Sequence, residues 1–277
     1  MDSVAAPGVP SPRWRLTLFR VLATLLGLVY LPGALLMAAP WAPSSMATAL
    51  PPLSPLIWAW AQAAHPDLQR WTFAISASVD EAIAVILLVA AWCPLARPVF
   101  VQFVALAFVV DLGANIAFDP EVMIAYASLL LLLVVYPEPR RLLTPFWRGP
   151  VDRPVLALAV VVGAFFVPAV WQALQSQAHG ADELALNFGW ASTVEHLCNL
   201  WLIGLLAAFR QPGSILLALL TAACLVYLGV AAVALPGNPG SWGVLGGGVT
   251  ILGGAAYLVI AAHARRLESR RGTDREA

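Results

Sequence analysis

The chain has 277 residues, of which 61% are hydrophobic and only 11% are charged, and its formal net charge is zero. Soluble globular domains carry about 25% charged residues, so this composition excludes an ordinary soluble domain. Without a net positive charge, the sequence gives no indication of a nucleic-acid partner.

Several apolar stretches reach or approach the roughly 20 residues that a helix needs to cross about 30 Å of hydrocarbon. We therefore expect an all-α, polytopic integral membrane protein with eight transmembrane helices and the lipid bilayer as its main partner. The expected spans are about 16–37, 71–94, 98–118, 121–136, 154–175, 188–209, 214–235 and 241–263.

The second half of the chain echoes the first at a constant spacing of 114 residues. The recurring pairs are Ser78 with Ser192, Glu81 with Glu195, and Pro98 with Pro212. This spacing predicts two four-helix repeats, whose topology is parallel because four is an even number, related by an axis along the membrane normal. The expected units are a disordered N-terminus 1–12, repeat 1 over 13–142 with an external loop 38–70, a cytoplasmic linker 143–153, repeat 2 over 154–267 and a cytoplasmic tail 268–277.

The arginines are placed unevenly along the chain, which contains no lysine. Of the connections expected on the outer side, only the first contains an arginine, Arg70. Basic residues concentrate on the cytoplasmic side of membrane proteins. We therefore expect a multi-pass protein of the cell (plasma) membrane with both termini in the cytoplasm.

Four acidic residues fall inside expected spans: Asp80, Glu81, Asp111 and Glu195. An Asp at the centre of a membrane helix costs at least about 2.5–3.5 kcal/mol on insertion scales, so such acids are functional candidates. No Lys or Arg is expected at their depth. Hydrocarbon surroundings then favour the uncharged form of each acid.

Polar residues accompany these acids at helical spacing. Asn115 lies four residues after Asp111, and Ser192 and Asn199 share a helix face with Glu195, whereas His196 is rotated by about 100° from Glu195. One interpretation is that this set binds a ligand or relays protons; the other is that it only joins helices by hydrogen bonds. The candidate ligand-binding or proton-binding residues are Glu81, Glu195, Asp80, Asp111, Asn115, Ser192, His196 and Asn199.

The sequence predicts neither a metal site nor a catalytic centre. Cys93, Cys198 and Cys224 show no CxxC spacing, which favours buried apolar thiols. A bis-His haem needs a second histidine at the depth of His196, and none is expected there. We interpret His196 as a core histidine that hydrogen-bonds a neighbour.

The last expected span carries small residues on one helix face. Gly243, Gly247, Thr250 and Gly254 follow one another at helical spacing. A stripe of small residues allows another helix to approach closely in a membrane. We therefore expect this stripe to be a helix-packing surface.

The text from Glu195 through Gly204 to Arg210, and from Glu81 to Arg97-Pro98, resembles the DoxX-like membrane proteins. In both stretches an acid near the start of a helix is followed by small and apolar residues, an arginine and a helix-starting Pro or Gly. The resemblance implies a four-helix bundle, present here as a tandem duplication. It also implies a redox-linked membrane subunit that meets quinone or a small sulfur compound in the bilayer.

Two functions therefore remain open at the level of sequence. The first is a non-catalytic, redox-linked DoxX-like subunit that binds a lipophilic ligand such as quinone and works with a redox partner protein. The second is a secondary, proton-coupled transporter of a small solute. A purely structural scaffold would be favoured if the four acids proved dispensable.

Overall fold

The computed structural model describes residues 13–37, 66–115, 123–142, 149–186 and 188–276. In these ranges the regular structure is helical, and β-type pairing is limited to an isolated bridge between Val151 and Phe209. The helices are α1 (Arg13–Met37), α4 (Pro66–Trp92), α5 (Pro98–Asn115), α6 (Met123–Val135), α7 (Pro139–Leu142), α8 (Arg153–His179), α9 (Glu183–Leu186), α10 (Gly189–Ala207), α11 (Ser214–Ala234) and α12 (Gly243–Glu276).

Each of the eight expected spans overlaps one of the longer helices, and several of these helices extend past the expected ends. Helix α4 begins at Pro66, ahead of the expected start, because proline is well suited to the first turn of a helix. Helix α12 continues to Glu276, past the end of the expected span 241–263. Arg and Glu are good helix formers, and the helix therefore continues past the end of the apolar stretch.

Five of the described helices are long and apolar enough to cross a membrane. They are α1, α4, α8, α11 and α12. Helix α5 is a shorter apolar helix of the same character, and α10 is not among the five. The polar residues Ser192, Glu195, His196 and Asn199 lower the mean hydropathy of α10.

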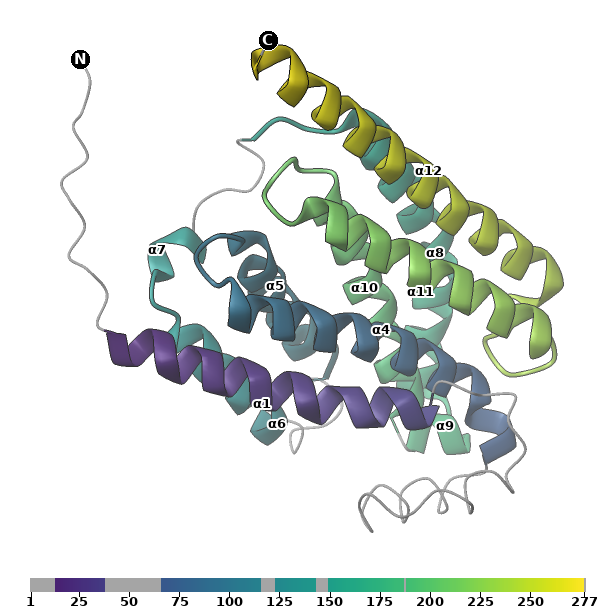
Figure 1. The fold of residues 1–277 in the computed structure, drawn as a ribbon. Coiled ribbons are helices and arrows are strands. Elements are labelled where there is room, and N and C mark those ends of the chain that lie inside the picture. The colour runs from purple at the N-terminus through teal and green to yellow at the C-terminus, as the bar shows by residue number, and fades with distance from the viewer. Residues whose placement is uncertain (1–12, 38–65, 116–122, 143–148, 187, 277) are drawn as a thin grey trace, which may run out of the picture.

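The longer helices are arranged in two rows of four (Figure 1). In one row α1 packs on α4, α4 on α11 and α11 on α12. In the other, α6 packs on α5, α5 on α10 and α10 on α8. Contacts between α1 and α6, α4 and α5, α4 and α10, α10 and α11, and α8 and α12 join the rows. Helices α4, α5, α10 and α11 therefore form the centre of the molecule.

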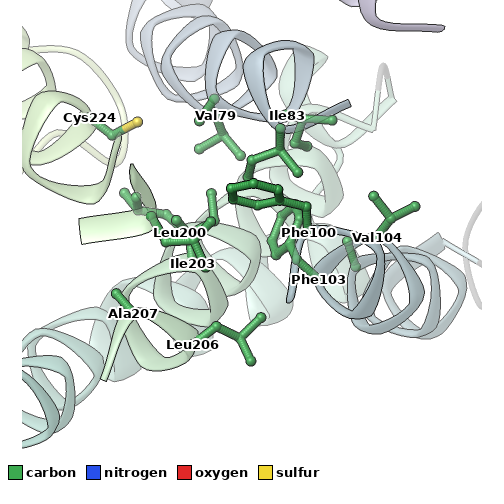
Figure 2. Packing of buried hydrophobic residues seen from close by; sticks show 14 of the residues in the cluster. Val79, Ile83, Phe100, Phe103, Val104, Leu200, Ile203, Leu206, Ala207 and Cys224 are labelled. Carbon is green, nitrogen blue, oxygen red and sulfur yellow. The ribbon is translucent and has the colours of Figure 1, made fainter. Parts of the chain in front are cut away.

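Large apolar side chains fill this centre where α4, α5 and α10 meet (Figure 2). Phe100 and Phe103 of α5 and Leu200 and Ile203 of α10 are completely buried, and Ile83 of α4 is 7% exposed. In lipid the hydrophobic effect does not drive helices together, so the close fit of these side chains is the main attraction between them.

The outer helices show the opposite pattern. Exposed apolar residues line α1, α8 and α12, among them Val29, Val161 and Leu252. Only 17% of the most apolar stretch of α1 and 22% of that of α8 is buried, against 67% of that of α4. Apolar faces of this extent suit contact with lipid chains rather than water.

The small-residue stripe of α12 packs against α11 at two of its positions. A Cβ on Gly247 would lie 2.6 Å from the Gly229 carbonyl oxygen, and one on Gly254 would lie 2.8 Å from that of Ala222. The absence of side chains at these glycines thus allows the two backbones to approach closely. Gly243 has no such neighbour and instead begins the helix with a φ of 62°.

Candidate functional site

A buried polar pair joins α5 and α10 near the centre of the molecule. The Asn199 amide Nδ2 donates a hydrogen bond of 2.8 Å to Oδ1 of Asp111. Asn199 is completely buried and Asp111 is 3% exposed. The two residues are 88 positions apart in the chain, so only the packing of α5 against α10 brings them together.

His196 forms a second polar link, from α10 to α4. Its Nδ1 lies 2.6 Å from the Ser192 carbonyl oxygen, one turn earlier in the same helix. Its Nε2 lies 3.2 Å from Oδ1 of Asp80. The interpretation of His196 as a hydrogen-bonded core histidine agrees with these two contacts.

Two serine hydroxyls extend this link. The Ser76 and Ser192 hydroxyl oxygens are 3.2 Å apart, and the Ser192 hydroxyl is also 3.2 Å from Nδ1 of His196. Contacts of hydrogen-bond length therefore run without a break from Ser76 through Ser192 and His196 to Asp80. We call the whole set the polar cluster: Ser76, Asp80, Asp111, Ser192, His196 and Asn199.

The face of α10 that carries the cluster differs slightly from the expected one. Ser192, Glu195 and Asn199 were the expected stripe, but the hydrogen-bonded members on α10 are Ser192, His196 and Asn199, spaced i, i+4 and i+7. Glu195 lies at the edge of this face, is partly exposed, and is close enough to Asp111 and His196 for electrostatic interaction.

Tyr30 is a site residue that the sequence reasoning missed. It lies on α1 within electrostatic range of Asp80, Asp111 and Glu195. A single tyrosine in a Leu-rich helix resembles an ordinary packing residue. The one sequence signal was its phenolic hydroxyl, a polar group within an apolar stretch.

Glu81 lies apart from the polar cluster. It neighbours Cys224 and Tyr227 of α11, and the Cys224 thiol donates a hydrogen bond of 3.1 Å to the Ser78 carbonyl oxygen. Adjacent residues of a helix point about 100° apart, which separates Glu81 from Asp80. The structure thus brings Asp80, Asp111 and Glu195 near one another and places Glu81 toward a different helix. The side chain of Asn115 lies outside the described residues.

The arrangement combines three acids, an imidazole, hydroxyls and an amide within a bundle of apolar helices. These groups can exchange protons and can donate or accept hydrogen bonds toward a polar ligand head. Within the described ranges no three His, Cys, Asp or Glu side chains converge as metal ligands would.

An apolar cavity of about 250 Å³ lies elsewhere, between α8, α11 and α12. Its lining includes Val161, Phe165 and Leu225 and shares no residue with the polar cluster. Its single polar lining residue, Thr250, already donates its hydroxyl to the Gly246 carbonyl oxygen. The cavity can therefore offer only apolar contact, unlike the cluster.

Comparison of the chain with protein-family models, with curated proteins and with solved structures finds no match. The functional argument therefore depends on the residues of this chain and on the geometry described above.

Proposed function

We propose that this chain is a DoxX-like integral membrane protein with eight membrane spans in two four-helix repeats, and that its polar cluster, with Glu195 and Tyr30, binds the polar head of a lipophilic ligand such as a quinone. The protein would act as a non-catalytic subunit beside a redox partner. The single observation that carries the proposal is the convergence of Asp80, His196, Asp111 and Asn199 at the central helix contacts.

The packing of the helices supports the two-repeat part of the proposal. The two repeats would equate α1 with α8, α4 with α10, α5 with α11, and α6 with α12. Under this pairing, the contact of α1 with α4 corresponds to the contact of α8 with α10. The contact of α5 with α10 corresponds to the contact of α11 with α4. Every packed pair of long helices in the two rows has its counterpart. A two-fold axis along the helices, between α4 and α10, would produce this pattern.

The chemistry of the cluster supports a ligand with an exchangeable proton. A quinone accepts hydrogen bonds through its carbonyl oxygens, and its reduced form donates them through hydroxyls. Carboxyl, imidazole and hydroxyl groups can match both forms and can pass a proton to either. An apolar bundle around the cluster suits the tail of such a ligand.

Purification in native lipid nanodiscs, followed by extraction and mass spectrometry, tests this proposal. We expect a quinone-class lipid to copurify with the protein. Glu195→Gln should weaken its binding by about tenfold, which corresponds to about 1.4 kcal/mol. Glu81→Gln is the matched control, since Glu81 faces Cys224 and Tyr227, and it should change binding less than twofold. Absence of any bound lipophile, with binding of added quinone indifferent to Glu195, would contradict the proposal.

A second candidate, proton-coupled transport of a small solute, is favoured by one observation. Nε2 of His196 and the carboxyl group of Asp80 lie 3.2 Å apart, so a proton can pass between α10 and α4 at this contact. Proteoliposomes that contain a pH-sensitive dye would show solute-dependent proton movement for a transporter. That movement should disappear in Asp80→Asn and in Asp111→Asn, whereas a pure binding protein shows none in any variant.

A further inference from the structure

The amide oxygen of Asn199 has no hydrogen-bond partner among the residues that the structure describes, although Asn199 is completely buried. The amide nitrogen of the same side chain is used, because it donates to Asp111. Buried polar atoms in native proteins almost always have a partner, either in the protein or in a bound molecule. The unmatched oxygen lies directly beside the carboxyl group of Asp111 and therefore at the polar cluster.

The nitrogen atoms of the His196 and Asn199 side chains each already contact a partner in the cluster. Nδ1 of His196 faces a carbonyl oxygen, which can only accept, so this nitrogen carries hydrogen and donates it to Ser192. Nε2 of His196 is occupied by Asp80, and Nδ2 of Asn199 by Asp111. Among the amide and imidazole atoms of the cluster, the one that a ligand would find without a contact is Oδ1 of Asn199, and this atom is an acceptor.

Because of Asn199, the preference for a ligand that donates a hydrogen bond does not depend on the protonation state of the acids. A carboxyl group can gain a proton and become a donor, and a hydroxyl such as that of Tyr30 can donate or accept. An amide oxygen accepts in every state. A ligand carbonyl placed against it would put two acceptors face to face, whereas a ligand hydroxyl would supply the missing hydrogen bond.

We propose that the cluster selects a ligand whose polar head donates a hydrogen bond to Oδ1 of Asn199, so that a hydroxylated ring of the hydroquinone type binds in preference to the corresponding quinone. This inference rests on the proposed function, because it assumes a ligand at the cluster, and it adds the redox form that the site holds. The protein would then retain the reduced ligand and release the oxidised one.

Three probes with the same alkyl tail test the inference on the full chain in nanodiscs under anaerobic conditions. They are a decyl hydroquinone, its benzoquinone and its dimethyl ether, and binding is followed by quenching of tryptophan fluorescence. The ether has the ring and the tail but no donor. We expect the hydroquinone to bind at least about tenfold more tightly than the other two, as a satisfied against an unsatisfied buried acceptor would give.

Variants connect the preference to Asn199. The double variant Asp111→Leu with Asn199→Val removes both polar partners together and should bind all three probes equally. Gln102→Leu is the control: Gln102 is a buried amide of α5 that donates to the Arg141 carbonyl oxygen, outside the cluster, and its loss should leave the preference intact.

The outcomes separate the two proposals. Equal binding of hydroquinone and dimethyl ether, or tighter binding of the quinone, overturns the preference while leaving a ligand site in place. Persistence of the preference in the double variant overturns the role of Asn199. Failure of all three probes to bind overturns the preference and the proposed function together.

Discussion

Two contacts at the centre of the molecule have the same place in the packing but differ at one pair of positions. One is α5 against α10, where Asp111 and Asn199 form a buried hydrogen bond. The other is α4 against α11, its counterpart under exchange of the proposed repeats. There, the residues at the 114-residue spacing are Val85 in place of Asn199 and Leu225 in place of Asp111, since 199 − 85 and 225 − 111 are both 114.

The comparison bears on why the polar groups are present. The contact of α4 with α11 packs without a counterpart to the Asp111–Asn199 pair. Replacement of buried polar partners by fitted apolar residues is often neutral or stabilising. Helix packing alone therefore does not require Asp111 and Asn199. This favours a role in ligand binding over a role in holding α5 and α10 together.

The largest effect on stability is expected for variants of the Asp111–Asn199 pair. Asn199→Val or Asp111→Leu alone should each lower the free energy of unfolding by about 3 kcal/mol, because the remaining buried side chain loses its hydrogen bond across the contact of α5 with α10. The double variant copies the counterpart contact and should return to within about 1 kcal/mol of the parent. Thermal unfolding in mild detergent measures all three. A double variant as unstable as the sum of the singles would show that the polar pair holds the helices together.

The second-largest effect is expected between α11 and α12, whose backbones approach closely at glycine residues. Gly247→Val should destabilise the protein by about 2 kcal/mol, because the new Cβ would meet the backbone of Gly229. Gly248→Val is a matched control one residue away, since nothing lies within 4 Å of a Cβ at Gly248. The same unfolding measurement applies. Equal loss in both variants would indicate a general effect of valine in the helix rather than close packing.

The smallest effect is expected at the link between α4 and α10. Asp80→Asn should lower the free energy of unfolding by no more than about 1 kcal/mol, because the Asp80 side chain remains 21% exposed and such contacts are weak. The stability of the parent and of the variant is compared by detergent titration. A loss of 3 kcal/mol or more would make the Asp80–His196 contact a structural element and weaken its assignment to ligand or proton binding.

Apolarity and spacing were sufficient to predict the helical class and a helix for each expected span. The last expected span ends at about 263 and helix α12 continues to Glu276, because hydropathy marks the membrane, whereas helix propensity decides where a helix stops. Helical periodicity predicts Glu195 on the face of Ser192 and Asn199, whereas the structure uses His196 there, because positions i+3 and i+4 lie equally close to position i on a helix. The partners Asp111 and Asn199 belong to different helices, so only the packing of α5 against α10 determines their contact.

The bond from His196 to the Ser192 carbonyl has a consequence for charge movement. Since Nδ1 keeps its hydrogen in every protonation state, the ring can gain or lose a proton only at Nε2, which faces Asp80. A proton can therefore pass between this imidazole and Asp80 of α4, but it cannot pass through the imidazole along α10. The backbone of α10 thereby leaves His196 a single nitrogen for proton exchange, and this nitrogen faces α4 in the other half of the chain.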